Sequence, residues 1–563
     1  KISDDRENIS DVPAVYFVKP TPENIQLIGK DFSNNLYESY YINFISTISK
    51  SLLESLAELS IKHNVFDSVK MVYDEYCSFC TLYDDLVVLN SQDCCTDKST
   101  FYVLNSRSVD ESDISEKITN ITDSLFDAMA TLGINPYIQY SMGHASEMIA
   151  KSLNKKLESA VRNDRNGLFK NVQISANIPV LIILDRNLDI TSSIQHNWCY
   201  ESLVNDLLTY KLNKVSFVEK ENDKLMEYNL PTTDEFWMTH KNRFFPLLAE
   251  SIQVELDKYK TEEEKIKNLK NSLILPNDAL SDKTTHLTTA LNTLPQLLEK
   301  KRVVDMHMNI ATGLLSQIKN RKIDSFFECE EKMLSMYTNI DKPLKEIYEN
   351  VNDDMQEDII RFLLLAYMCD YNQQKLSLLS AHCHDIENMN CLKKCVDYIN
   401  STSEFTKIRS IHVKTGSVTK IDDMDDGATK TIKMFSNLLS SASYFAMEGV
   451  KNLVQKQHKL PLTKIVDSLL SSKNKNSCFG FIDTNNENSQ PRSPSDIHLQ
   501  PKDIFIFVCG GGNYAEYNNM VEYAKNKSSV NKLTYMCSEM IKPSNFLQTL
   551  QKLGSELLKE SAA

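Results

Sequence analysis

The sequence predicts an α/β protein in which the second of two parallel-sheet domains is split by a large all-α insertion. Two apolar runs, residues 180–184 and 504–508, carry this prediction. Each is too short for an ordinary helix and lacks polar alternation, which is typical of a central strand in a parallel sheet that is buried on both faces. The roughly three hundred residues between them have helical periodicity almost throughout. One sheet interrupted by a helical domain is therefore expected.

Length, charge and cysteine content narrow the class of protein. The 563 residues are too many for one core and suggest roughly three or four domains. A formal net charge of −14 argues against a nucleic-acid-binding scaffold, which normally carries a basic excess. Thirteen cysteines in scattered, mostly apolar contexts indicate free thiols in a reducing cytosol. No apolar run approaches the roughly 20 residues that span a bilayer, so a cytoplasmic protein is expected.

Residues 1–112 are predicted to form the first α/β domain. A strand at 14–18 is followed by a helix with Thr21 as N-cap and Pro22 at its first position. A second strand at 40–45 precedes a helix at about 49–60. This βαβα alternation indicates a small parallel sheet. Because the chain opens in the middle of the pattern, the first strands of this domain are expected to lie outside the sequence.

The second α/β domain is predicted to combine residues 113–230 with 476–563. Its first part contains strands at 137–140 and 180–184, and its second part contains strands at 504–508 and 533–536. Residues 231–475 between these parts form the helical domain. Within that domain an acidic stretch at about 409–432 is predicted to be a mobile loop.

Polar residues at the ends of the two central strands raise the alternative of an enzyme. Asp185, Arg186 and Asp189 follow the first strand, and a turn from Gly510 to Asn513 follows the second. Such residues at the carboxyl edge of a sheet suit an α/β hydrolase or a nucleotide-dependent enzyme. The turn lacks the Lys-Ser/Thr of a phosphate-binding loop, and no nucleophile with a partner is evident. In the structural interpretation, the carboxylates at the strand end pair with Arg186 and cap the next helix.

The densest group of metal-ligand residue types comprises His382, Cys383, His384, Cys391 and Cys395. Four of them could surround a zinc ion. Their spacing matches no standard finger, and the last two are simply one helical turn apart. No metal and no cofactor are therefore expected, although zinc at this cluster remains open.

Two helical stripes allow either burial or binding. The pattern from 284 to 318 contains Pro295, which should kink or break a helix. The pattern indicates either a helix hairpin buried in the core or a hinged helix that offers a groove to a partner helix. The second stripe lies on a predicted helix whose opposite face carries several serines and few charges. Such a helix suits burial or weak adsorption to a membrane. The residues of this stripe that would contact a membrane include Phe435, Leu438, Leu439 and Phe445.

Several long blocks stand out along the chain: residues 11–18, 36–46, 181–189 with His196 and Trp198, 294–301, 447–454 and 508–517. In this order they resemble the SM (Sec/Munc) family of SNARE-binding membrane-fusion proteins. The resemblance is strongest to the Sly branch, which serves traffic between the endoplasmic reticulum and the Golgi. A match in order over most of the chain is more specific than any single motif.

The resemblance implies a three-domain arch without enzyme activity. It implies a monomer that binds a syntaxin-type (Qa) SNARE and the assembled SNARE bundle, and so promotes SNARE assembly and vesicle fusion in ER–Golgi transport. It also implies peripheral association with ER and Golgi membranes, and no nucleic-acid partner. A passive helical tether is a third class, which would bind membranes or coats without selecting SNAREs.

The resemblance further implies particular binding residues. A pocket for the N-terminal peptide of the syntaxin would lie on two consecutive helices of the first domain, one with Leu53, Leu56 and Ala57 and the next with Val69, Val72 and Tyr73. The spacing within each set places its members on one helical face. Leu294, Pro295 and Leu298 would form the hinge of a helix that aligns SNARE helices. The loop at 409–432 and the helix after it would cover the SNARE groove and sense membrane.

Overall fold

The computed structural model describes residues 7–89, 98–162, 167–169, 178–219, 224–272, 280–334, 340–369, 386–402, 459–470, 478–484 and 502–562. Two compact units are present. The first comprises Lys1–Arg186, Lys464–Gly512 and Met520–Met540, and the second comprises Asn187–Thr463, Asn513–Asn519 and Ile541–Ala563. Over the described residues, no helix is both long enough and apolar enough to cross a membrane.

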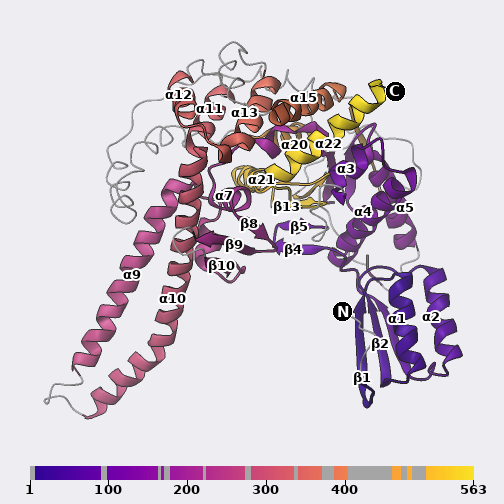
Figure 1. The fold of residues 1–563 in the computed structure, drawn as a ribbon. Helices are drawn as coiled ribbons and strands as arrows, with labels where there is room; N and C mark the ends of the chain where they lie inside the picture. Colours follow the sequence, from indigo (N-terminus) through magenta and orange to yellow (C-terminus); the bar gives the residue numbers. More distant parts are fainter. Residues whose placement is uncertain are drawn as a thin grey trace. The chain divides into compact units, whose positions relative to one another are not determined.

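The first unit begins with a three-stranded parallel sheet in the order β1-β2-β3. Figure 1 shows two helices, α1 and α2, side by side along this sheet. Their apolar faces and one face of the sheet make a single core, which includes Tyr40, Ile42, Phe44 and Leu56. The elements are β1 (Ile9–Val18), α1 (Pro22–Ser33), β2 (Tyr37–Phe44), α2 (Lys50–Lys62) and β3 (Val69–Asp74).

Side-chain caps fix where the two helices begin. The Thr21 hydroxyl accepts a hydrogen bond from the backbone N–H of Asn24 at 3.3 Å, and Pro22 occupies the first helical position. The Ser49 hydroxyl accepts one from the N–H of Leu52 at 3.4 Å. Each cap satisfies a backbone donor that the helix itself leaves unpaired. Both predicted helices of this region are therefore confirmed.

The prediction of a second pocket helix is wrong, because Val69, Val72 and Tyr73 lie on strand β3. Three residues with this spacing cannot distinguish a helix from a strand, and β-branched and aromatic side chains favour the strand. Successive strand residues point to opposite faces of a sheet, except at the irregular step after Val69, where Tyr40 pairs with Val69 but Tyr41 with Met71. Val72 packs against the core, whereas Tyr73 is 50% exposed on the other face.

The larger sheet of the first unit has seven strands in the order β11-β6-β7-β12-β13-β5-β4. Strands β7 and β12 are direct parallel neighbours, with Val180 opposite Ile504 and Asp185 opposite Cys509. All six residues of β7 are buried. The prediction that the two distant apolar runs share one sheet is confirmed. The strands are β4 (Cys80–Tyr83), β5 (Leu86–Val88), β6 (Tyr137–Ser141), β7 (Val180–Asp185), β11 (Phe479–Ile482), β12 (Asp503–Cys509) and β13 (Lys532–Cys537).

The pairing of β5 bears on the predicted domain limits. Strand β5 pairs in parallel with β13, and β4 pairs with β5, so both belong to the larger sheet. Residues 80–88 were expected in the first α/β domain. Strand pairing favours a first domain that ends before β4, because a backbone ladder ties these strands to the other sheet. The helices of this sheet are α3 (Thr100–Asn105), α4 (Glu111–Leu132), α5 (Ala145–Arg162), α20 (Pro461–Leu470, in part) and α21 (Tyr514–Asn526, in part).

The second unit is mainly helical, and its most extended feature is the hairpin of α9 and α10 (Figure 1). An antiparallel sheet, β10-β9-β8, packs against α10, where the ring of Phe217 occupies the space beside Gly313. This small sheet was not anticipated from the sequence. The elements are α6 (Thr191–Ile194), α7 (Tyr200–Leu207), β8 (Thr209–Lys211), β9 (Lys214–Glu219), β10 (Lys224–Asn229), α8 (Glu235–His240), α9 (Phe245–Ser272), α10 (Leu280–Arg321), α11 (Ile323–Leu334), α12 (Asp341–Glu349), α13 (Gln356–Met368), α15 (Ile386–Ser401) and α22 (Pro543–Ala562).

A buried imidazole joins three segments of the second unit. The Nδ1 atom of His196 lies 2.7 Å from Glu330 on α11, and its Nε2 atom lies 3.0 Å from Asp358 on α13. All three side chains are fully buried. Burial and the charge of Arg361 oppose protonation of the imidazole, but the two carboxylates outweigh them and raise the pKa of His196. His196 is thus the bridge between α11 and α13, and the two carboxylates favour its protonated form.

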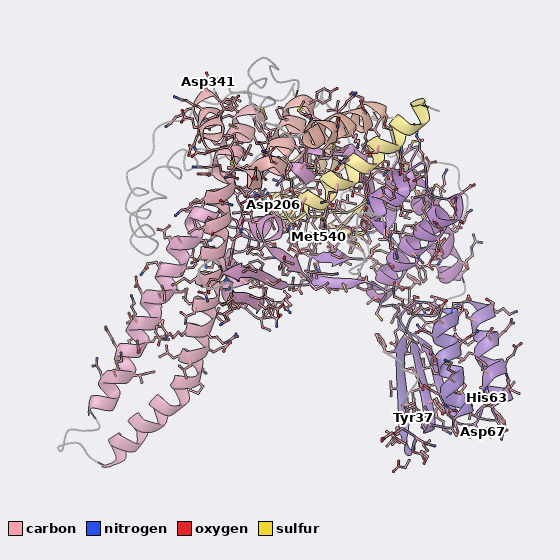
Figure 2. The ribbon with its side chains drawn as sticks, viewed as in Figure 1. Tyr37, His63, Asp67, Asp206, Asp341 and Met540 are labelled. Atoms are coloured by element: carbon pink, nitrogen blue, oxygen red, sulfur yellow. The ribbon has the colours of Figure 1, made fainter. Side chains whose placement is uncertain are left out.

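Two arginines complete this buried ion network. Arg321, at the end of α10, donates two hydrogen bonds to Asp358 at 2.8 and 2.6 Å. Arg361 donates two to Asp206 on α7 at 3.1 and 2.9 Å (Asp206 is labelled in Figure 2). Burial opposes ionisation of both aspartates, yet the arginine and histidine charges lower the pKa of each. The network therefore ties α10 to α7, α11 and α13.

A second contact holds the middle of α10. His307 lies 3.0 Å from the carboxylate of Asp234 and 3.0 Å from the hydroxyl of Tyr200. Its ring is fully buried and stacks on Trp237. His307 on α10 thus contacts Tyr200 at the start of α7, and Asp234 and Trp237 at the start of α8. These contacts define the position of this part of α10 in the unit.

We expect Asp358→Asn to lower the free energy of unfolding by about 3–5 kcal/mol, because it leaves two arginines and an imidazolium short of a buried negative charge. Urea unfolding measures this change. Glu349→Gln is the matched control, since it removes the exposed Lys345–Glu349 pair and should have no measurable effect. Equal stability of Asp358→Asn and the wild-type protein would show that the network is not a stabilising link.

The raised pKa of His196 also predicts a pH dependence. A group whose pKa is higher in the folded state stabilises the fold fully below its unfolded pKa, here about 6.5, and loses that effect as pH rises through the folded pKa. Wild-type stability should therefore fall above neutral pH more steeply than that of His196→Gln. Urea titrations between pH 6 and 9 compare the two slopes, and parallel slopes would contradict this role for His196.

Candidate partner-binding sites

Helix α2 has one flank against α1 and the other flank free of it. Leu59 fills the space beside Gly29 on α1, where an added Cβ would lie 2.8 Å from the leucine Cδ1. Leu53 and Ala57 project from the other flank of α2, more than 100° around the helix from Leu59. Since α2 connects β2 to the edge strand β3, this flank lies on the β3 side. We call it the α2–β3 flank.

The structure brings most of the predicted pocket residues together at the α2–β3 flank. Leu56 is only 3% exposed and belongs to the core, and Val69 and Val72 pack against the same cluster. Leu53 is 43% exposed, and Ala57 is exposed one turn further along α2. Leu56, Val69 and Val72 therefore form an apolar floor, with Leu53 and Ala57 at the surface.

Tyr73 does not belong to this group, because strand alternation places it on the opposite face of the sheet. Its hydroxyl lies 3.1 Å from the sulfur of Met71, which is also exposed there. Conversely, the prediction missed Ile61, which is 68% exposed and continues the spacing of Leu53 and Ala57. The i, i+4, i+8 repeat was the signal that could have found it.

Apolar and charged side chains join α9 and α10 in the described part of the hairpin. Ile266 and Leu297 are buried against each other, with Tyr259 packed beside them. Lys300 on α10 donates to both carboxylate oxygens of Glu262 on α9 at 3.1 Å. Exposed ion pairs of this kind contribute little, so the apolar contact is the main attachment between the helices here.

Helix α10 runs through Pro295 without interruption, so of the two predicted effects of the proline, a kink or a break, the break does not occur. Figure 1 shows α10 changing direction toward its N-terminal end, the part that contains Pro295. A proline removes one backbone hydrogen bond and crowds the preceding turn, which accounts for a bend without a break. Leu298 is 56% exposed, whereas the side chain of Leu294 lies outside the described residues.

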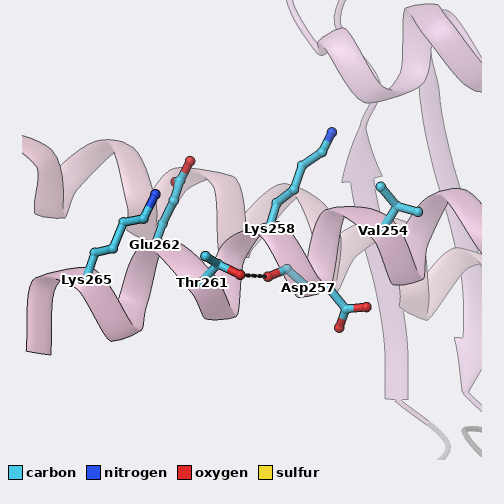
Figure 3. A pocket seen from close by; sticks show the side chains of 6 residues that line it. All are labelled: Val254, Asp257, Lys258, Thr261, Glu262 and Lys265. Atoms are coloured by element: carbon cyan, nitrogen blue, oxygen red, sulfur yellow. Dashed lines mark hydrogen bonds between the residues drawn. The ribbon is translucent and has the colours of Figure 1, made fainter.

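Helix α9 carries a shallow hollow of about 440 Å³. Figure 3 shows its side chains projecting from successive turns of the one helix. Charged and polar groups predominate, and Val254 is the only aliphatic side chain among those lining it. This surface suits contact with a polar partner better than enclosure of a small apolar ligand. The lining residues are Val254, Asp257, Lys258, Thr261, Glu262 and Lys265.

The carboxylates that suggested an enzyme are occupied by structural hydrogen bonds. Asp185 accepts from the hydroxyls of Ser141 and Ser146 and from the backbone N–H of Ser146, at the start of α5. Burial raises the pKa of Asp185. The fully buried Arg186 donates to the backbone oxygen of Gly511 at 3.3 Å. These contacts fit the capping interpretation.

Asp189 and Asn513 act in the same way in the second unit. Asp189 accepts hydrogen bonds from Thr191 and from both the N–H and the hydroxyl of Ser192. The Asn513 side chain accepts from the N–H of Glu516 at 2.8 Å, in the first turn of α21. Both side chains therefore satisfy backbone donors at helix starts, and the enzyme alternative is not favoured.

Of the remaining predicted residues, the structure describes only Cys391 and Cys395. Cys391 and Cys395 are buried on α15. His382, Cys383 and His384 lie outside the described residues, and within the part that the structure describes no group of side chains is suited to hold a metal ion. The loop at 409–432 and the stripe of Phe435, Leu438, Leu439 and Phe445 are also outside it.

A mostly parallel sheet, whose two central strands come before and after a long helical insertion in the sequence, defines a split α/β protein. Residues 1–549 match the Sec1 family. The human Sec1 family domain-containing protein 1 is 38% identical over 591 residues, covering 98% of this chain and 88% of that protein. Protein sly1 of Schizosaccharomyces pombe is 31% identical and covers 98% of this chain and 87% of its own length. The chain belongs to the Sec1 family.

Solved structures have the same fold. Sly1p in complex with an N-terminal peptide of Sed5p matches with a TM-score of 0.75 and 26% identity, covering 99% of this chain and 87% of that one. The SM protein Vps45 in complex with the Qa SNARE Tlg2 matches with a TM-score of 0.70 at 16% identity, over 98% and 88% of the two chains, which shows the fold alone. The predicted family and fold class are confirmed.

We expect Pro295→Ala to stabilise the N-terminal part of α10 by up to about 3 kcal/mol, since alanine restores the missing backbone donor. Backbone amide exchange in this part of the helix should slow accordingly. Leu298→Ala is the control, because it shortens an exposed side chain on the same helix without adding a hydrogen bond. Unchanged exchange in Pro295→Ala would mean that the proline does not weaken α10.

Proposed function

We propose that this chain is an SM-type chaperone that binds a Qa SNARE and promotes SNARE assembly and vesicle fusion in ER–Golgi transport. The observation that carries the proposal is its similarity, over almost its whole length, to Sly1p, which was solved with an N-terminal peptide of Sed5p. The sly1 homologues in other organisms support the same branch of the family. The partner is thus a protein segment, and the action is non-catalytic.

The α2–β3 flank is the proposed site for the N-terminal peptide of the Qa SNARE. Its apolar floor of Leu56, Val69 and Val72 is already formed without a ligand, and Leu53 and Ala57 border it. A preformed apolar site loses little conformational entropy on binding, so a short peptide could bind reversibly through one apolar side chain. Tyr73 is excluded from this site by its position on the other face of the sheet.

The α9–α10 hairpin is the proposed surface on which SNARE helices align and the SNARE bundle assembles. At 1.5 Å per residue, the 42 residues of α10 extend over about 63 Å, a length suited to several turns of a partner helix. Its root is fixed by Arg321 and its middle by His307. A surface held at two points presents partner helices in one orientation, and so lowers the entropic cost of bringing them together.

The domain arrangement and the location belong to the same proposal. We assign the first α/β domain to peptide binding, the split α/β domain to support, and the helices of 231–475 to SNARE alignment. The protein would act as a monomer in the cytoplasm, peripherally associated with ER and Golgi membranes. Contact of the stripe around Phe435 with a membrane remains a prediction, as does a covering role for the loop at 409–432.

We expect Leu53→Lys to weaken binding of the Sed5p N-terminal peptide at least tenfold, because a charge replaces an apolar contact worth about 1.5 kcal/mol or more. Titration calorimetry measures the affinity, and circular dichroism should show an unchanged fold. Ser55→Lys is the control, with the same charge on the opposite side of α2. Leu56→Lys is unsuitable, because its buried side chain makes unfolding of the domain the expected result. If Leu53→Lys binds the peptide with the affinity of the wild type, the proposed site does not lie on this flank.

A further inference from the structure

The exposed apolar surface of α2 continues beyond the proposed pocket. Leu53, Ala57 and Ile61 are spaced four residues apart, so they follow one flank of the helix. At 1.5 Å per residue this stripe is about 12 Å long. Leu53 is 43% and Ile61 68% exposed. A pocket for a single side chain does not require apolar residues over two turns.

The turn after α2 adds a large aromatic side chain at the end of this stripe. Phe66 is 52% exposed, and it lies between His63 and Asp67, which are labelled at the end of α2 in Figure 2. The neighbouring Val65 is buried in the core, and its backbone N–H donates to Ser60 at 2.9 Å. Because Val65 anchors the turn, Phe66 is held toward solvent.

Backbone hydrogen bonds make this turn a fixed feature of the domain. Asn64 has the left-handed φ of 58° and donates from its N–H to Ile61 at 3.0 Å. Ser68 and Val69 both donate to the carbonyl of Val65, at 2.9 and 3.2 Å. Single exposed apolar residues are ordinary on protein surfaces, but several along one helix flank and in the turn that follows it are typical of an interaction site.

Carboxylates border the stripe on its outer side. Glu54 and Glu58 follow Leu53 and Ala57 by one residue each, which turns them about 100° further around the helix. Glu54 pairs with Lys50 at 3.6 Å. Glu58 is exposed, and in the described part of the chain it forms no ion pair. A segment lying on the stripe would be stabilised there by a basic side chain.

We propose that the Qa-SNARE N-terminal segment binds along the whole stripe, with a second apolar side chain against Ile61 and Phe66 and a basic side chain beside Glu58. The inference rests on the proposed function and extends its site from one anchor to two, about 12 Å apart. Continuity with the Leu53–Ala57 surface identifies the occupant, because a peptide that leaves that surface along α2 reaches Ile61 next. Two anchors would select segments by the spacing of their apolar residues.

The test is titration calorimetry of the full chain with the Sed5p N-terminal peptide. Ile61→Gln and Phe66→Gln should each weaken binding about tenfold, because each removes an apolar contact. Ser55→Gln, which places the same side chain on the far side of α2, should bind as the wild type does. Glu58→Lys should weaken binding in low salt, with a smaller effect in high salt.

The outcomes separate this inference from the proposed function. If Leu53→Lys loses affinity while Ile61→Gln and Phe66→Gln bind as Ser55→Gln does, the second anchor is overturned and the proposed pocket stands. If none of these variants, Leu53→Lys included, changes the affinity, both are overturned. Loss of affinity at Leu53, Ile61 and Phe66 with an unchanged Ser55→Gln supports the two-anchor site.

Discussion

The buried ion network around Asp358 is the constraint on which the arrangement of the second unit depends. Charged and polar groups without a partner are very unfavourable in a protein interior, so Arg361 and His196 can be fully buried, and Arg321 largely buried, only when their carboxylate partners are in place. Those partners come from α7, α11 and α13. Formation of the network therefore requires the end of α10 and these three helices to assemble together, and this fixes the root of the α9–α10 hairpin.

The two proposed binding surfaces differ in how they are supported. The hairpin is fixed at Arg321 and His307, and further along its helices meet at an apolar contact between Ile266 and Leu297. The α2–β3 flank instead lies directly on a core, because Val65 and Leu56 are buried beneath it. The first surface suits partners that are long helices, which can add contacts along its length. The second suits a short peptide, whose few side chains need a site that is already formed.

The central strands of the larger sheet and the starts of the first two helices were predicted best. The runs around Ile182 and Ile506 are apolar at every position, and only a strand covered on both faces accounts for that. Thr21 and Ser49 marked the helix starts because capping depends on local chemistry. Val69 to Tyr73 was misread as a helix, since five residues fit either period and pairing with β2 decides between them.

Other features of the site depend on tertiary packing that a single sequence does not reveal. Leu53 and Leu56 are the same residue type less than one turn apart, yet one is exposed and the other is core, because the direction of the sheet decides which flank is covered. The partners of His196 lie 134 and 162 positions away. The sequence left open whether Pro295 kinks or breaks its helix, and helix α10 accommodates the one missing hydrogen bond within a continuous run.

Hydrogen–deuterium exchange of the full chain with and without the Sed5p N-terminal peptide would test the central claim most directly, since it reports every segment without assuming a site. The account predicts slower exchange in α2, in the turn around Phe66 and in β3, with little change in α9 and α10. Protection confined to the hairpin, or to the edge of the seven-stranded sheet near Asp185, would contradict the claim that the α2–β3 flank binds the Qa SNARE.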